Sequence, residues 1–270
     1  MADGGEGCYV YCVVPADDRP TLDGLRAVDR RHPLEVVNDD GLAAVVSSVP
    51  LEEFGEEALR RNFEDMDWLE RTARAHQDVL GGVLERSPAL VPMRLCTIFA
   101  DPDHVREMLE REGPVLADAL ERVRDRSEWG VKVLADRAAV EAAARARAGD
   151  QAPEEGAGGA GRAYLARKRV ERSLQERSRE MVDAAIEAIH TRLRTEADAA
   201  TLLPPQRREL SGRTGEMVLN GAYLVHRARV GGFTAAVEEL RERHRDLGLE
   251  IELGGPWAPY NFVPEGREPP

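Results

Sequence analysis

Residues Leu249 to Phe262 read LEIELGGPWAPYNF, and the predicted fold is built outward from this stretch. Its first five residues alternate between apolar and acidic, the period-2 pattern of a strand with one buried face. Gly254–Pro256 then stop the strand, because proline cannot donate a hydrogen bond to a neighbouring strand. Three aromatic side chains follow within six positions, in a chain that is only 5% aromatic: Trp257, Tyr260 and Phe262. We expect this tail to fold back and seal the core of the second half; a partner-binding surface is the alternative.

The first part of the chain is predicted to follow the order β-α-β-β-α-β. Asp39-Asp40-Gly41 separates two apolar runs, and glycine supplies the positive φ that a tight hairpin needs. Apolar residues at spacings of three and four then predict an amphipathic helix that Ser87-Pro88 ends. The expected elements are a strand at 9–14, a short helix at 21–28, strands at 34–38 and 42–49, a helix at 63–86 and a strand at 91–99. This is the order of a ferredoxin-like unit.

The rest of the chain repeats the same order of elements without a sequence repeat. Asp101 is a natural N-cap with Pro102 behind it, and it starts a helical region that Gly113-Pro114 is expected to interrupt. The predicted fold class is α+β, with two ferredoxin-like units. The predicted domains are an N-terminal α+β domain at 8–100, a connecting helical region at 101–127, and a C-terminal α+β domain at 128–264. In the C-terminal domain we expect strands at 129–134, 202–210, 216–226 and 249–253, and helices at 162–200 and 233–246.

Two features set the predicted C-terminal domain apart. Residues 149–161 are rich in glycine and alanine and lack an apolar face, so we expect a flexible insertion. They contain a literal G-x-G-x-x-G, but a dinucleotide site needs a buried strand directly before it, and Pro153-Glu154-Glu155 stand there instead. On the long helix that follows, a narrow apolar stripe includes Leu174 and Met181, which indicates coiled-coil-like packing on this protein or on a partner.

Composition limits the possible partners and the compartment. The net charge of −13 argues against nucleic acid and against an anionic membrane surface as partners. The start of the chain lacks the basic region of a signal peptide, and the longest uncharged stretch, Gly41 to Leu51, is far shorter than the ~20 residues of a membrane span. Cys8 and Cys12 lie about 13 Å apart on one predicted strand, too far apart for a disulfide. A cytoplasmic protein with reduced thiols is expected.

The sequence carries no strong catalytic motif, and we expect neither an enzyme nor a bound cofactor or metal. The six histidines lack the spacing of metal ligands. His76 lies near the apolar stripe of its helix, where a structural role is favoured; a thiolate pair with Cys96 is the alternative, and an inert buried thiol is preferred. Arg94 is expected in the middle of a strand, where a guanidinium needs a carboxylate partner. A structural ion pair is favoured there over a contact to an anion or a partner.

Four stretches, in order, resemble the gas vesicle accessory proteins of the GvpF/GvpL family. The first is the YVYCVV run at 9–14. The second is VPMR at 91–94, followed by TIF at 97–99. The third is MVLNGAYLV at 217–225, and the fourth is the closing GPWAPYNF at 255–262. The resemblance covers roughly residues 8 to 263. Two departures are Cys96, where a small residue such as glycine is more usual, and the insertion at 149–161.

The resemblance implies a function that the motifs alone do not. Proteins of this family are minor components of gas vesicles, thought to bind the small hydrophobic shell-forming protein and to assist its assembly. It implies an association with gas vesicles and with the shell protein, and possibly with other accessory proteins. The alternative is a small-molecule-binding or sensor protein built on tandem ferredoxin-like units, with a pocket of converging charges around Arg94. The candidate partner-binding residues are Arg94, Leu174, Met181, Trp257, Tyr260 and Phe262.

Overall fold

The computed structural model describes residues 5–18, 20–148, 160–205 and 215–264. The chain divides into two compact units: unit 1 comprises Met1–Glu128 together with Pro256–Pro270, and unit 2 comprises Trp129–Gly255. The division differs from the expected domains at two places. The helical region at 101–127, expected as a connector, belongs to unit 1, and so does the tail after Gly255.

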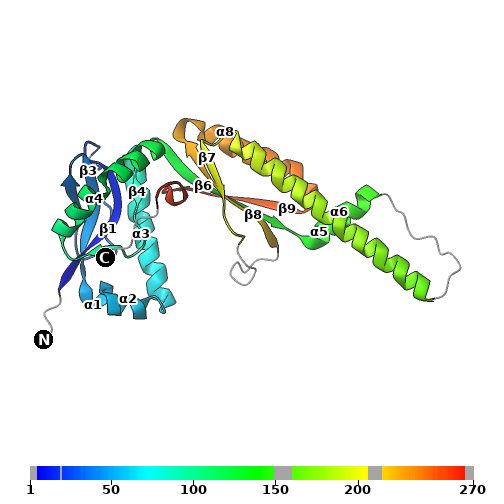
Figure 1. The fold of residues 1–270 in the computed structure, drawn as a ribbon, viewed down its shortest axis with the longest axis horizontal. Coiled ribbons are helices and arrows are strands. Elements are labelled where there is room, and N and C mark those ends of the chain that lie inside the picture. The colour runs from blue at the N-terminus through cyan, green and yellow to red at the C-terminus, as the bar shows by residue number, and fades with distance from the viewer. Residues whose placement is uncertain (1–4, 19, 149–159, 206–214, 265–270) are drawn as a thin grey trace. The chain divides into compact units, whose positions relative to one another are not determined.

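Unit 1 is built around one antiparallel sheet with the strand order β2-β3-β1-β4, in which β5 also pairs with β1 (Figure 1). The predicted hairpin is confirmed: β2 and β3 pair in antiparallel register, and Asp40 and Gly41 at its turn have φ values of 32° and 82°. The strands of this sheet are β1 (Glu6–Pro15), β2 (Glu35–Asp39), β3 (Leu42–Pro50), β4 (Val91–Pro92) and β5 (Ile98–Phe99).

The central strand β1 is buried on both faces, and a bulge changes its alternation. Its pairing with β3 shifts between Val10 and Cys12, so one extra residue stands opposite the partner strand. Tyr11 and Cys12 therefore both join the core on one side of the sheet, whereas Cys8 joins the core on the other side. All three cysteines of the chain are free thiols.

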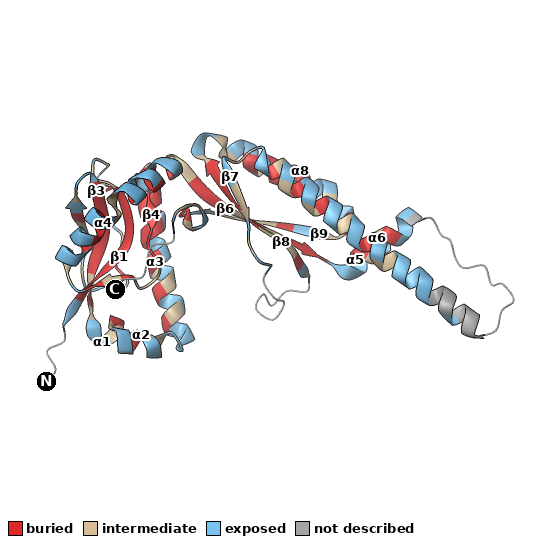
Figure 2. Ribbon diagram, viewed as in Figure 1, coloured by how far each residue is buried: buried red, intermediate tan, exposed pale blue. Residues whose placement is uncertain are grey.

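Helices cover both faces of this sheet. One core cluster joins the sheet to α4 (Pro102–Val123), and the other joins it to α1 (Leu51–Phe54) and α3 (Met66–Arg86), with α2 (Glu56–Asn62) between them. Asp101 caps α4 as predicted: its side chain accepts hydrogen bonds from the backbone N–H groups of Asp103 and His104 at 2.9 and 3.0 Å. The strands β1 and β3 stand out as buried, and the outer faces of the helices as exposed (Figure 2).

Two predictions for unit 1 are wrong. Residues 21–28 form turns rather than a helix: Gly24 has φ +81°, and the N–H of Val28 donates to the Tyr11 hydroxyl at 3.0 Å instead of to a helical carbonyl. Helix α4 also runs through Gly113-Pro114 without a break. Pro114 is exposed, so a carbonyl that loses its helical partner there can bond to water, and buried apolar residues on both sides of the proline hold the helix on the sheet.

Unit 2 contains the second sheet, with the strand order β7-β8-β6-β9. The strand predicted at 216–226 is confirmed. In place of the strand predicted at 202–210, the structure has β7 at Ala199–Leu202. Residues 206–214 lie outside the described part of the chain. The other two strands are longer than predicted and extend into unit 1. The strands are β6 (Arg126–Ala135), β7 (Ala199–Leu202), β8 (Glu216–His226) and β9 (Leu249–Trp257).

A single core cluster joins this sheet to three helices: α5 (Arg137–Ala148), α6 (Ala160–Arg194) and α8 (Val230–His244). Short 3-10 turns follow β8 at Arg227–Arg229 and α8 at Arg245–Leu247. The predicted insertion falls almost entirely on residues 149–159, which lie outside the described residues, as do Gly156 and Gly158 of the glycine motif. The architecture is α+β, as predicted.

Candidate partner-binding site

The tail, residues 256–264, packs on unit 1 and not on the second core. Ala258 is only 3% exposed within the helix-covered core that contains Trp68 and Leu80, and Tyr260 packs against the same cluster. Val263 packs against the core on the opposite face of the sheet. The expectation that the aromatic tail folds back is thus met, but the core that it closes lies in the first half of the chain.

A chain of hydrogen bonds holds Tyr260 in place. The Tyr260 hydroxyl lies 3.0 Å from His76 Nε2 and donates to the Met93 carbonyl oxygen at 3.3 Å. The other ring nitrogen of His76, Nδ1, lies 2.9 Å from the Tyr9 hydroxyl, and the Tyr9 oxygen accepts the N–H of Cys96 at 3.0 Å. Residues from β1, α3, the 93–97 turn and the tail therefore meet at one buried imidazole.

One tautomer of neutral His76 satisfies every member of this chain. Because the Tyr260 hydroxyl donates to Met93, its oxygen must accept from Nε2–H; Nδ1 is then left to accept the proton of the Tyr9 hydroxyl. Protonation of the ring would place a second N–H donor at Nδ1 and would break this chain of hydrogen bonds. Burial also disfavours the charged ring and lowers the pKa of His76 from 6.5 to about 4. His76 is thus the hydrogen-bonded structural histidine that the sequence favours.

A second contact fixes the tail at its next residue. Asn261 donates its backbone N–H to Glu128 Oε2 at 2.9 Å and its side-chain amide to Glu128 Oε1 at 2.6 Å. Burial raises the pKa of Glu128, and the two hydrogen bonds from Asn261 oppose that rise. Glu128 is 7% exposed, so these bonds satisfy a buried carboxyl group. No local sequence pattern predicts that Tyr9, Glu128 and Asn261 hold the tail.

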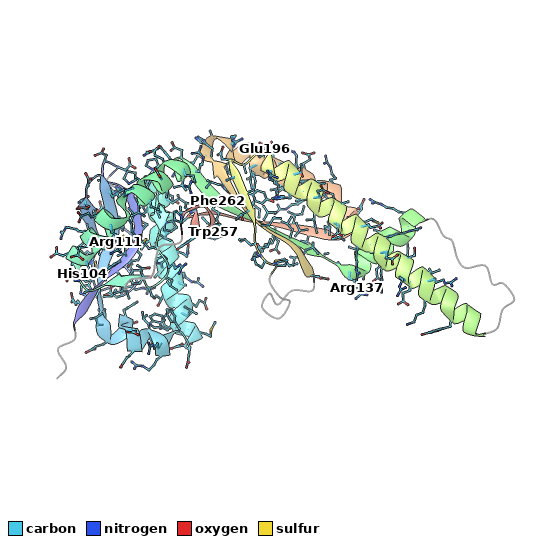
Figure 3. The ribbon with its side chains drawn as sticks, viewed as in Figure 1. His104, Arg111, Arg137, Glu196, Trp257 and Phe262 are labelled. Carbon is cyan, nitrogen blue, oxygen red and sulfur yellow. The ribbon has the colours of Figure 1, made fainter. Side chains whose placement is uncertain are left out.

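The other two aromatic residues of the tail lie at its surface. Trp257 is 50% exposed and Phe262 is half-buried, and Figure 3 shows both beside the short 3-10 turn η3 (Tyr260–Phe262). Arg94 directly follows Met93, whose carbonyl oxygen accepts the hydrogen bond from the Tyr260 hydroxyl. We call Arg94, Trp257 and Phe262 the tail surface. Trp257 and Phe262 flank the partly buried Tyr260 in the tail, and Arg94 follows the residue that Tyr260 contacts.

The prediction that Arg94 lies in the middle of a strand is wrong. The expected strand at 91–99 is divided into β4 and β5 by a turn, in which the Arg94 carbonyl oxygen accepts from the Thr97 N–H at 3.2 Å and its hydroxyl at 2.8 Å. Arg94 is exposed in this turn. Cys96 has φ +61°, the left-handed conformation in which glycine costs least, which explains why a cysteine there is a departure from the expected pattern.

Cys96 and His76 do not form a nucleophilic pair. The two residues are linked through Tyr9, and both ring nitrogens of His76 are already taken up by the tyrosine hydroxyls. Burial raises the pKa of the Cys96 thiol to about 12, so the thiol is protonated at neutral pH. The pair therefore lacks both a free base and a thiolate.

The remaining two candidate residues lie on α6 in unit 2 and differ in their packing. Met181 packs against the core cluster together with Val182 and Ile186, and Leu174, two turns nearer the start of the helix, is half-buried and outside that cluster. The apolar stripe is therefore core along the C-terminal part of α6. Neither residue belongs to the unit that carries the tail surface, because unit 1 contains no part of α6.

Unit 2 contains a cavity of about 340 Å³ between α5, α6 and β8. Its charged lining includes Arg137 and Glu141, which pair with each other at 3.0 Å, and Arg94 does not line it. Within the described residues, no three His, Cys, Asp or Glu side chains are grouped to hold a metal ion. Nor does any helix in the described ranges have the length and apolar character for a membrane span.

Comparison with known proteins identifies the family. The model of the family described as gas vesicle synthesis protein GvpL/GvpF matches residues 7–264. Gas vesicle protein L of Streptomyces sp. (strain CB03234) is 38% identical over 260 residues, which cover 94% of this chain and 92% of that protein. Gas vesicle protein F of the same strain is 28% identical, over 94% of this chain and 98% of that protein. Relatives with both names therefore match along nearly the whole chain.

Two solved structures share the fold. The crystal structure of GvpF from Anabaena sp. PCC7120 superposes with a TM-score of 0.70 at 19% identity, covering 98% of each chain. That of GvpF from Microcystis aeruginosa gives a TM-score of 0.65 at 18% identity, over 95% of this chain and 98% of the other. At these identities the likeness establishes the fold, and the family follows from the sequence matches. The chain belongs to the gas vesicle synthesis protein GvpL/GvpF family.

Proposed function

We propose that this protein is a non-enzymatic assembly factor or minor structural component of gas vesicles that binds the hydrophobic shell-forming protein. The observation that carries this proposal is the family match over residues 7–264, together with relatives named gas vesicle protein L and F along nearly the whole chain. A shell subunit exposes apolar surface before it polymerises. A partner that covers this surface would keep the subunit from aggregating until it joins the shell.

The tail surface is the proposed contact for the shell protein. Trp and Arg are enriched among the residues that dominate binding energy, and Trp257 presents half of its area to solvent. The hydrogen bond between His76 and the Tyr260 hydroxyl and the one that Asn261 donates to Glu128 hold the tail in place, so little ordering entropy would be lost on binding. Arg94 and Phe262 extend the surface, which gives an aromatic centre with a charged rim.

The buried polar groups of unit 1 support a binding role over a catalytic one. His76 has no ring nitrogen left for a substrate, and Cys96 is a protonated thiol. Tyr9 and Tyr260 complete the same hydrogen-bonded chain, and burial raises the pKa of both hydroxyls. These groups therefore serve to close the fold over the tail.

Co-purification with the shell-forming gas vesicle protein tests this function. The tagged protein and the shell protein are produced together, and the complex is washed at low and high salt, without added nucleotide or metal. Because apolar burial would carry the contact, the shell protein should remain bound at both salt concentrations. Absence of the shell protein from the eluate at low salt would overturn the proposal.

Two matched variants test whether the tail surface makes the contact. Trp257→Ser removes a side chain that is 50% exposed, and Val115→Ser removes one that is 53% exposed on α4 of the same unit. We expect the first to reduce the bound shell protein at least about tenfold, as loss of a central aromatic anchor does, and the second to leave it unchanged. Equal binding by both variants would place the contact elsewhere.

A further inference from the structure

The two units carry very different charges. Unit 1 contains 30 acidic and 16 basic side chains, whereas unit 2 contains 20 acidic and 21 basic ones. The net charge of −13 thus consists of −14 in unit 1 and +1 in unit 2. The excess of negative charge therefore belongs to unit 1.

The positive charge of unit 2 is concentrated at the start of α6. Residues 168–179, which we call the basic arm, contain five Arg or Lys and two Glu. Val170 is 49% exposed on this arm. Tyr164, one turn before the arm, is 57% exposed, and the Lys168 ammonium lies 5.7 Å from the centre of its ring. Packing of α6 against the core of unit 2 begins further along, at Met181. The arm and the turn before it therefore expose apolar side chains among positive charges.

A surface of opposite charge lies on unit 1. Residues 51–70, which form α1, α2 and the start of α3 and which we call the acidic face, contain eight Asp or Glu and two Arg. Leu51, Phe63 and Met66 are exposed there by 39%, 45% and 70%. The Phe63 ring is held edge-on against the ring of the buried Trp68, with 6.2 Å between their centres. Like the arm, this face combines exposed apolar side chains with one sign of charge.

We propose that the basic arm of one molecule docks on the acidic face of a second copy. The charges of the two surfaces are complementary, and each surface supplies apolar side chains that the contact would bury. Because the two surfaces differ, the contact is heterologous: each molecule keeps one free arm and one free face, and repeated contacts build head-to-tail chains. This inference does not depend on binding of the shell protein.

Charge-reversal variants of the purified full-length protein test the docking. The arm variant carries Arg169→Glu and Arg172→Glu, and the face variant carries Glu57→Arg and Glu64→Arg; all four residues are exposed. Arg106→Glu with Arg111→Glu on α4 is the control, because it changes the net charge by the same amount as the arm variant. Sedimentation velocity over a range of protein and salt concentrations measures association, and circular dichroism verifies that each variant is folded.

The wild type and the control should associate as their concentration rises and should dissociate at high salt. The arm variant and the face variant should each associate at least about tenfold more weakly, because each brings like charges together. An equimolar mixture of the two should regain association, since the acidic arm of one variant then meets the basic face of the other.

Three outcomes would overturn the proposal. One is a wild type that stays monomeric at every concentration, which would mean that the basic arm does not bind a second copy. Another is association that neither reversal weakens. The third is a mixture that associates no better than its separate components.

Discussion

Acid should lower the free energy of unfolding of unit 1 by protonating one buried imidazole, that of His76. In the fold, burial holds its pKa at about 4, and the neutral ring joins two tyrosine hydroxyls. In the unfolded chain the ring titrates at its ordinary pKa of 6.5. Because the folded pKa is the lower one, the unfolded state binds the proton first as the pH falls. The stabilisation is therefore fully present above pH 6.5 and is lost progressively toward pH 4.

The difference between these pKa values sets the size of the effect. A fall from 6.5 to about 4 corresponds to ~3 kcal/mol of unfolding free energy, a large part of the stability of a typical domain. His76→Gln should remove this dependence, because an amide can accept from Tyr9 and donate to Tyr260 without titrating. Between pH 7 and pH 4, wild-type unit 1 should lose ~3 kcal/mol more than the variant does.

The assay must report on unit 1 alone. The chain has three tryptophans, and Trp68 lies in the core of unit 1 at 5% exposure. Replacing Trp129 and Trp257 with phenylalanine in both proteins leaves Trp68 as the only tryptophan whose fluorescence follows urea unfolding. Equal losses of stability with and without the His76→Gln substitution would refute the argument that a neutral imidazole closes this network.

Other contacts give further tests. Tyr260→Phe should lower the unfolding free energy by ~1–3 kcal/mol, because it leaves a buried ring N–H without its acceptor, whereas Trp257→Ala at the surface should cost less than ~1 kcal/mol; urea unfolding measures both. Cys96→Gly should be more stable than Cys96→Val by more than ~1 kcal/mol, since a β-branched residue tolerates φ +61° poorly; equal melting temperatures would contradict this reasoning. Met181→Asp should destabilise unit 2 by ~2–4 kcal/mol and Leu174→Asp by less than ~1 kcal/mol, and the reverse order in thermal unfolding would show that the arm is the packed part.

Local sequence patterns predicted the elements that depend on neighbouring residues. The hairpin at Asp39-Asp40-Gly41 and the cap at Asp101 follow from side chains that bond or turn within a few positions. The turn at 94–97 was missed because its left-handed residue is Cys96, and a cysteine carries no turn signal. The continuity of α4 through Pro114 was missed because packing on the sheet outweighs the local break.

The tail makes contacts that local sequence patterns cannot predict. Its aromatic content predicted that it would fold back, but the contact of Tyr260 with His76 joins residues 184 positions apart. Periodicity cannot tell which of two cores such a segment closes. One signal was available in the sequence: a histidine near an apolar helix stripe, which needs a buried hydrogen-bond partner.

Amide hydrogen exchange with and without the shell-forming gas vesicle protein tests the central claim most directly. If the tail surface is the contact, binding should slow exchange in residues 93–97 and 257–263, while β1 and β3, buried in both states, should change little. Unchanged exchange in both tail-surface segments when the shell protein is bound would contradict the account.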